Sequence, residues 1–130
     1  MSTDITEIIA SSLELVAERA GDPGPQVYAR LFAEFPETEA RFIRDVTGAI
    51  RAEMLTMVFD CLLAPDGPYQ KNLVLAERVN HDGFGTPPEV FDRFFPIVME
   101  TCREILGADW TPQLEAAWTA QLARYMSART

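Results

Sequence analysis

The chain has 130 residues, 48% of them hydrophobic, and its 20 acidic against 11 basic residues give a net charge of −9. This length predicts a single domain over residues 1–130 with a substantial core. The negative charge repels phosphate backbones and anionic lipid, which argues against nucleic acid or a membrane as partner. Asp4 and Glu7 stand where a signal peptide needs basic and apolar residues, and no apolar run reaches the ~18 residues of a membrane span, so the expected location is cytoplasmic.

Residues 5–20 place apolar side chains three or four positions apart, which predicts an amphipathic helix. Asp4 and Glu7 are spaced at its start as in a capping box. Two prolines and two glycines within residues 21–25 predict where this helix ends.

The same spacing predicts a second helix over residues 27–35. Pro36 interrupts it, and a short, polar helical turn is expected to lead to Phe42. A third helix is predicted from about residue 47 to 63, and residues 64–68, with two prolines and a glycine, are predicted to form a loop.

Residues 73–81 are expected to be helical, with a less regular apolar pattern. Residues 86–89 (Thr-Pro-Pro-Glu) combine a threonine N-cap, a proline at the first helical position and a glutamate three residues after the cap. The helix that begins there is predicted to stop at Gly107. The pair Thr111-Pro112 starts a last helix in the same way, with its apolar residues between 114 and 125.

No segment alternates polar and apolar residues over a useful length, so the predicted fold class is all-α, with six or seven helices. Cys61 and Cys102 lie among apolar residues and are interpreted as buried, reduced thiols. A zinc site formed by these two cysteines and His81 is the alternative, although no CxxC spacing supports it.

His81 is the only histidine, and it stands at the end of a predicted helix before a break rich in glycine and proline. The ordinary interpretation is a capping or surface residue, which the helix dipole favours; the alternative is a metal ligand. No GxSxG, phosphate-binding loop or GxGxxG motif is present, and Cys–His catalysis would need a thiol beside the imidazole. An aromatic-rich core with one imidazole suits a flat, apolar cofactor.

Three segments, in this order, carry a family resemblance. They are VYARLFAEFPETEARF (residues 27–42), HDGFGT (residues 81–86) and ILGADWTPQLEAAW (residues 105–118). Together they resemble a globin of the bacterial single-domain or flavohaemoglobin-like kind, over about residues 25–125. The resemblance implies a globin fold of six to eight helices around a pocket for haem b, and the glycines after the histidine would let the chain reverse over the haem edge.

The resemblance also implies a role for each matching residue. His81 is expected to bind the haem iron through its imidazole, and Phe42 to pack on the porphyrin face. Tyr28 is expected to donate a hydrogen bond to the bound gas, with Arg51 and Leu55 on the same distal side. The residues expected to contact haem are Phe42, Arg51, Met54, Leu55, Asn80, Phe84, Phe91 and Phe94.

The implied function is reversible binding of dioxygen, CO or NO, for storage, sensing or NO detoxification. No reductase domain accompanies the chain, so NO dioxygenase turnover would need an external reductase, and catalysis is not the expected primary function. A monomer or a homodimer is expected.

Two residues favour an alternative, a haem-free globin-fold sensor or protein-interaction module. Arg51 stands where the family usually has Gln or His. Glu77 stands four positions before the histidine, where an apolar residue is usual, although a two-residue shift would bring Leu75 into that role. Phe91 replaces a tyrosine found in many members, which argues against peroxidase-like activation.

Overall fold

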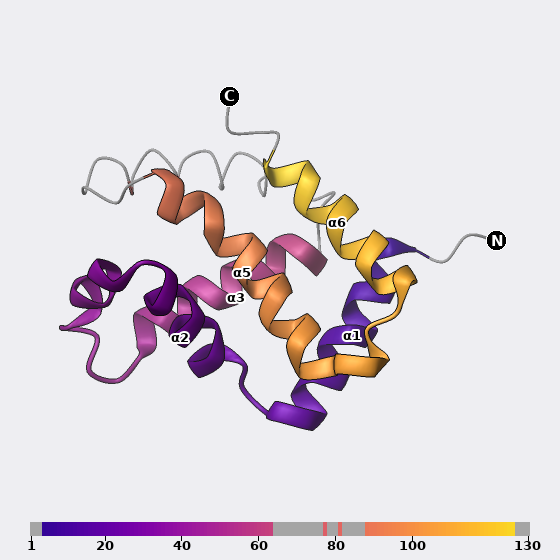
Figure 1. The fold of residues 1–130 in the computed structure, drawn as a ribbon, viewed down its shortest axis with the longest axis horizontal. Coiled ribbons are helices and arrows are strands. Elements are labelled where there is room, and N and C mark those ends of the chain that lie inside the picture. The colour runs from indigo at the N-terminus through magenta and orange to yellow at the C-terminus, as the bar shows by residue number, and fades with distance from the viewer. Residues whose placement is uncertain (1–3, 64–76, 78–80, 82–87, 127–130) are drawn as a thin grey trace.

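The computed structural model describes residues 4–63, 77, 81 and 88–126. Within these ranges the chain forms helices and turns and contains no β-strand, which confirms the all-α class. With labels as in Figure 1, the elements are α1 (Ile5–Ala20), α2 (Gly24–Glu34), the 3₁₀ helix η1 (Pro36–Phe42), α3 (Ala49–Leu63), α5 (Pro88–Leu106), the 3₁₀ helix η2 (Gly107–Asp109) and α6 (Pro112–Met126).

Three predictions fall wholly or largely outside the described residues. The predicted loop over residues 64–68 lies wholly outside them. Of the predicted helix over residues 73–81, only Glu77 and His81 are described, and both are helical. The predicted N-cap at Thr86 lies outside the described ranges, which resume at Pro88, where α5 begins.

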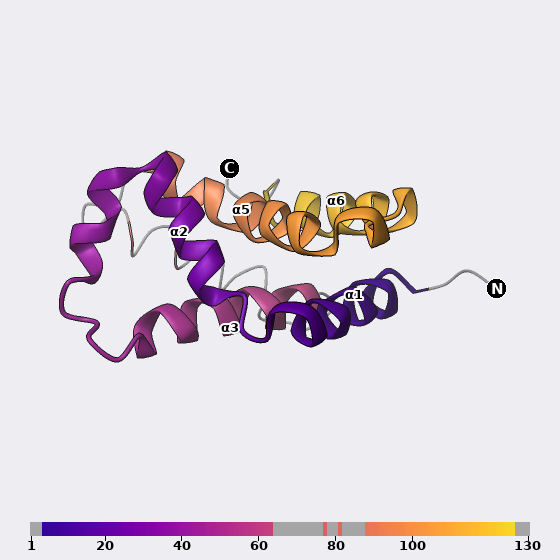
Figure 2. The same cartoon turned by 60° about the horizontal axis from the view of Figure 1, so that its bottom comes forward.

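The helices stack in two layers (Figures 1 and 2). Helices α1 and α3 lie side by side in one layer, and α5 and α6 form the other, so that α1 contacts α3, α5 and α6. Helix α2 crosses between the layers and contacts α3, α5 and η1. No helix in the described ranges is both long enough and apolar enough to span a membrane.

The helix boundaries follow from local chemistry. Asp4 caps α1 by accepting a hydrogen bond from the amide of Thr6 at 2.9 Å. The predicted capping box paired Asp4 with residue 7, so the cap forms at the predicted residue but with a different partner. Gly21 ends α1 with φ of 67°, a left-handed conformation that favours glycine. Helix α3 starts at Ala49, two residues later than predicted, because residues 43–48 form a loop instead of the first helical turn.

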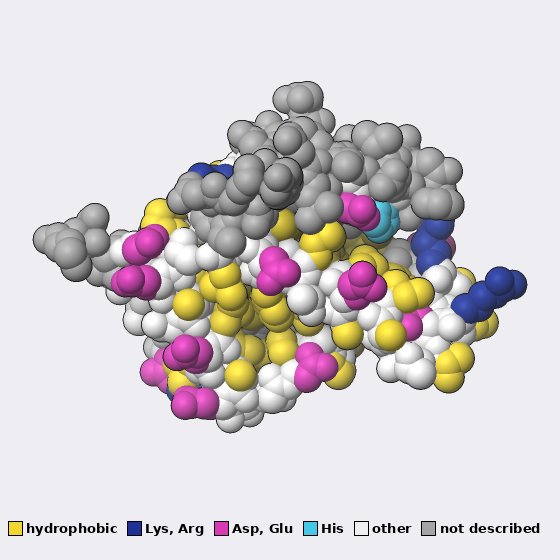
Figure 3. Space-filling view, turned by 180° about the vertical axis from the view of Figure 1, so that it is seen from behind, with side chains coloured by type: hydrophobic (Ala, Val, Ile, Leu, Met, Phe, Trp, Pro, Cys, Tyr) yellow, Lys and Arg dark blue, Asp and Glu magenta, His cyan; other side chains and the backbone are white. Residues whose placement is uncertain are grey.

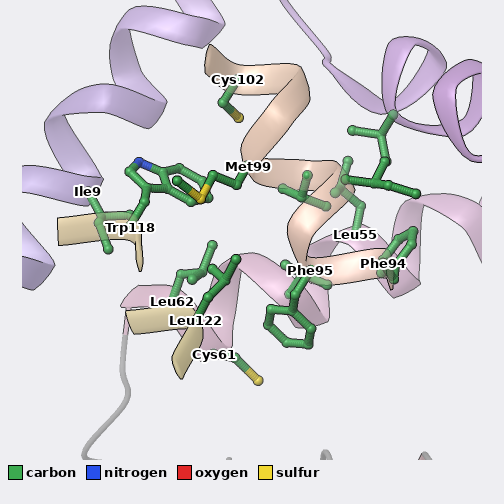
Figure 4. Packing of buried hydrophobic residues seen from close by; sticks show 14 of the residues in the cluster. Ile9, Leu55, Cys61, Leu62, Phe94, Phe95, Met99, Cys102, Trp118 and Leu122 are labelled. Atoms are coloured by element: carbon green, nitrogen blue, oxygen red, sulfur yellow. The ribbon is translucent and has the colours of Figure 1, made fainter. Parts of the chain in front are cut away.

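The core lies between the two layers (Figure 4). It is centred on Trp118, which is fully buried between α1, α3 and α5 together with Ile9 and Leu62. The buried Ser12 hydroxyl donates to the Ile9 carbonyl at 2.6 Å and accepts from the Trp118 indole at 3.0 Å. These buried polar groups are paired, which spares the core the free-energy cost of an unsatisfied donor.

Cys61 on α3 and Cys102 on α5 are buried and free, as predicted. Burial raises the pKa of the Cys61 thiol to about 11 and that of Cys102 to about 12, because a thiolate is poorly stabilised away from water. Among the described residues, no group of three metal-ligating side chains occurs, so the zinc alternative gains no support there.

Candidate functional site: an apolar cavity edged by a histidine

An apolar cavity of about 540 Å³ opens between α2, η1, α3 and α5, and we call it the histidine cavity. Its size lies in the range of small-molecule and cofactor sites, roughly 300–1,000 Å³. Most of its described lining is aliphatic or aromatic, and its polar members are Thr38, Arg41 and His81. The apolar members are Leu31, Phe42, Ile50, Met54, Met57, Val58, Val90, Phe91, Phe94 and Phe95.

The His81 imidazole is held by the helical turn that precedes it. Its Nδ1 lies 2.7 Å from the backbone carbonyl oxygen of Glu77. Because a carbonyl only accepts, Nδ1 donates in this contact, and in the neutral tautomer with that proton the lone pair is on Nε2. This hydrogen bond through the other ring nitrogen is the arrangement that orients metal-ligating histidines.

The surroundings of His81 are mixed. Its ring lies 5.1 Å from that of Phe91, tilted by 54°, on the cavity side. Its Nδ1 also lies 3.7 Å from the Glu77 carboxylate, with both side chains half-buried. Figure 3 shows the histidine at the molecular surface beside an acidic side chain. The imidazole therefore stands at the cavity edge, with one side apolar and one side charged.

A second cavity, of about 780 Å³, lies between α2, α3 and the loop that joins η1 to α3, and we call it the arginine cavity. Tyr28, Arg51 and Leu55, the three residues expected to contact the gas, all line it. None of the three is among the residues that line the histidine cavity. The structure thus divides the expected site between two neighbouring cavities.

The two faces of α3 explain this division. Ile50, Met54 and Met57 share one helical face and line the histidine cavity. Arg51 and Leu55 are four residues apart on a different face and line the arginine cavity. Met54 and Leu55 were expected in one pocket, but adjacent helical positions point in different directions.

The Arg51 guanidinium is bound to the preceding loop. Its Nε donates to the Asp45 carboxylate at 3.0 Å, and its Nη2 donates to the Asp45 carbonyl at 2.9 Å. Burial opposes ionisation of Asp45, but hydrogen bonds from the amides of Ile50 and Arg51 and from the guanidinium outweigh it and lower its pKa. Arg51 thus has the carboxylate partner that a partly buried guanidinium requires.

The Tyr28 ring forms the wall between the cavities. It packs against Phe42 at 5.6 Å and Phe94 at 5.7 Å, both of which line the histidine cavity. Its hydroxyl donates to the Arg51 carbonyl at 2.9 Å. Burial raises the pKa of the Tyr28 phenol well above its ordinary value, with Arg51 opposing the shift and Asp45 adding to it. The hydroxyl is therefore neutral and committed to a backbone acceptor.

Of the residues expected at the haem site, the structure brings Phe42, Met54, His81, Phe91 and Phe94 together around the histidine cavity. The expected contacts Asn80 and Phe84 lie outside the described residues. The lining residues that were not predicted include Arg41, whose position beside Phe42 in η1 was the available signal, and Leu31, Thr38, Ile50, Met57, Val58, Val90 and Phe95.

The fold and the site together define an all-helical protein with an apolar cavity edged by an oriented histidine. Comparison of the chain with protein-family models, with curated proteins and with solved structures found no match. The family and the ligand are therefore proposals that the residues themselves must support.

Proposed function

We propose that the protein is a globin-type haem protein that reversibly binds a diatomic gas: dioxygen, CO or NO. The observation that carries the proposal is the orientation of His81, whose Nδ1 is held by the Glu77 carbonyl while its ring lines an apolar cavity. An imidazole held in this way presents Nε2 as a metal ligand. Three of the aromatic residues that the globin resemblance assigns to haem, Phe42, Phe91 and Phe94, line the same cavity.

The chemistry of the lining suits haem b. The porphyrin is a large, apolar disc, and aromatic and aliphatic walls remove such a surface from water with a favourable free energy. Bound haem would supply an iron atom that can coordinate a diatomic gas, and His81 is the residue that would hold that iron. The protein's own contribution is to hold His81 in place, to exclude water with Phe42 and Phe94, and to shape the cavity.

Arg41 gives the cavity a positive rim. It is the only Lys or Arg side chain among the described lining residues, and it is exposed to solvent. Haem carries two carboxylates on one edge, and a chain of net charge −9 disfavours anions except where a basic side chain stands. Arg41 is thus placed to pair with a haem carboxylate while the apolar part of the ligand lies inside.

A second candidate, a haem-free sensor or interaction module, is favoured by one observation. The Tyr28 hydroxyl and the Arg51 guanidinium are hydrogen-bonded within the protein and line the arginine cavity rather than the histidine cavity. Under the haem proposal, the Tyr28 hydroxyl has to break its hydrogen bond to the Arg51 carbonyl and donate to the gas instead. Under the second candidate, the hydroxyl keeps its hydrogen bond to the Arg51 carbonyl.

NO dioxygenase activity is part of this proposal only on the condition that an external reductase supplies electrons. Each turnover consumes electrons, and the haem iron would have to be reduced again by an external reductase. The free thiols of Cys61 and Cys102 are compatible with a reducing, cytoplasmic environment, in which such donors are found.

The test is an absorption spectrum of protein produced with ample haem precursor, recorded oxidised, reduced, and reduced under CO. We expect a sharp Soret band that shifts when CO binds, at one haem per chain. A colourless protein that also fails to bind added haemin would exclude the haem proposal and leave the second candidate.

A further inference from the structure

The loop between η1 and α3, together with the first turn of α3, presents large apolar side chains to solvent. Ile43 is 79% exposed, Val46 88% and Ile50 55%, and we call these three residues the apolar knuckle. The other exposed large hydrophobic residues of the described chain, Ile5 and Leu63, reach only 39% and 38%. Apolar side chains gathered on a surface in this way mark an interaction site more often than isolated ones do.

The backbone beneath the knuckle is fixed by hydrogen bonds within the protein. The buried Asp45 carboxylate accepts from the amides of Ile50 and Arg51, each at 3.1 Å, and from the Arg51 guanidinium. The Gly48 amide donates to the Asp45 carbonyl at 3.1 Å, and its φ of 79° is a left-handed conformation that favours glycine. A loop already fixed in one conformation loses little entropy when a partner covers it.

A hollow adjoins the knuckle. It has a volume of about 500 Å³ and is lined by Phe32, Pro36, Ala40, Phe42 and Ile43, with Glu39 and Arg51 among its polar members. Ile43 belongs both to the knuckle and to the wall of the hollow. The same surface therefore carries an apolar projection and an apolar recess.

Charges of both signs flank this surface. Arg44, which follows Ile43 in the loop, is exposed and makes no ion pair with the described residues. Glu39, at the hollow, is also exposed. In a two-fold contact, each surface meets another copy of itself, so a projection needs a recess and a cation needs an anion on the same patch.

We propose that this surface binds a second copy of the chain, with the knuckle of each copy seated in the hollow of the other. The knuckle lies at one end of the long axis, away from the start of α1 (Figures 1 and 2). Figure 3 shows apolar and basic side chains together at that end. An end-to-end pair keeps the two acidic bodies apart, and charges more than about 8 Å apart are largely screened at physiological salt.

Acidic side chains of the flanking helices argue against an anionic membrane as the partner. Glu37 and Glu39 in η1 and Glu53 in α3 are exposed and would repel anionic lipid. A single arginine such as Arg44 adds only about 1 kcal/mol of attraction to anionic lipid. The surface is small for a permanent interface, so the pair forms weakly and depends on protein concentration.

Sedimentation velocity of the haem-free chain, over concentrations on the order of 10 µM to 1 mM, tests the pairing. We expect the average mass to rise toward that of a dimer for the natural sequence. Val46→Asp should stay monomeric across the range, because a carboxylate would be buried at the contact. Ile5→Asp adds the same charge at the opposite end and should associate like the natural chain.

A cross-linking experiment tests the two-fold geometry. Val46→Cys should give a covalent dimer with a short bis-maleimide, whereas Ile5→Cys should not. Cys61 and Cys102 are buried and have raised pKa values, so their thiols should not react with the maleimide. A natural chain that is monomeric at every concentration, or a Val46→Asp variant that associates equally, overturns the proposal. Since both measurements use haem-free protein, their failure leaves the haem proposal untouched.

Discussion

The histidine cavity and the arginine cavity share the Tyr28 wall and differ in how their polar groups are satisfied. In the arginine cavity, the Tyr28 hydroxyl donates to the Arg51 backbone carbonyl, and the Arg51 guanidinium donates to the Asp45 carboxylate. In the histidine cavity, one imidazole nitrogen is held by Glu77, and Nε2 makes no hydrogen bond to the described residues. Among the described residues of the two cavities, Nε2 of His81 is thus the polar atom that we expect to be available to a ligand.

This difference has an energetic meaning. A buried polar group that already has a partner must lose that hydrogen bond before it can serve a ligand, at about 1–3 kcal/mol. A nitrogen with a free lone pair beside an apolar cavity has no such bond to break. We therefore expect a ligand to be anchored from the histidine cavity, with the arginine cavity contributing mainly to the structure of the loop and of α3.

The largest expected effect comes from His81→Ala. We expect at least about a 100-fold loss of haemin affinity, because losing even the hydrogen-bond partner of a ligating histidine typically costs about 10- to 100-fold. Titration of haemin followed at the Soret band measures the loss. The matched control is Glu77→Ala, which keeps the backbone carbonyl on Nδ1 and should change affinity only a few-fold. Equal affinity and an unchanged spectrum in His81→Ala would contradict the assignment of the iron ligand.

Tyr28→Phe tests the hydrogen bonds of the arginine cavity. It removes the hydrogen bond to the Arg51 carbonyl, and we expect the free energy of unfolding of haem-free protein to fall by about 1 kcal/mol. Urea denaturation measures this change. Tyr125→Phe is the comparator, because its hydroxyl donates to the Cys61 carbonyl at 2.5 Å and it lines neither cavity. No loss of stability in Tyr28→Phe would mean that its hydroxyl is not bound to the Arg51 carbonyl.

The same pair of variants sharpens the role of Tyr28 in gas binding. If the hydroxyl leaves Arg51 for the gas, Tyr28→Phe should release dioxygen several-fold faster while Tyr125→Phe does not. If both variants release the gas at the same rate as the natural chain, the Tyr28 hydroxyl does not contact the gas. The arginine cavity then contributes to the structure of the protein and not to ligand binding.

A smaller effect is expected from Arg41→Gln. An exposed ion pair contributes up to about 1 kcal/mol, so haemin affinity should fall by about three- to fivefold at low salt and by less at high salt. Arg44→Gln is the control, since it removes the same charge three residues away but does not line the cavity. Haemin with both carboxylates esterified should bind the two variants equally. A loss that persists with the ester would show that Arg41 acts through packing and not through its charge.

The fold could be predicted from the sequence in large part, because helical periodicity and cap residues are local signals. The predicted helix over residues 5–20 agrees with α1, and the break at Pro36 separates α2 from η1. The start of α3 was wrong by two residues. There the Asp45 carboxylate accepts from the amides of residues 50 and 51, so the loop extends beyond Thr47.

The site could be predicted only in part. The resemblance grouped Phe42, His81 and Phe94, and the structure places all three at the histidine cavity, while their role toward a ligand stays a prediction. It could not separate Met54 from Leu55, because which face of α3 meets which cavity depends on how α2 crosses it. Helical periodicity alone would have grouped Arg51 with Leu55, four residues on, and this signal was available in the sequence.

The smallest expected effect is confined to alkaline pH and concerns the Tyr28 phenol. Burial raises its pKa, so the folded chain keeps the phenol neutral at pH values where the unfolded chain ionises it, above about 10. The stability that this group contributes is thus complete below about pH 10 and falls as the pH rises toward the pKa of the folded state. The advantage of the natural chain over Tyr28→Phe in the free energy of unfolding should therefore fall by about 0.4 kcal/mol between about pH 7 and about pH 10 in urea denaturation, because half of the unfolded phenols are ionised at the higher pH. A constant gap would show that Tyr28 ionises equally in the folded and unfolded chains, and hence that water reaches its hydroxyl through the arginine cavity.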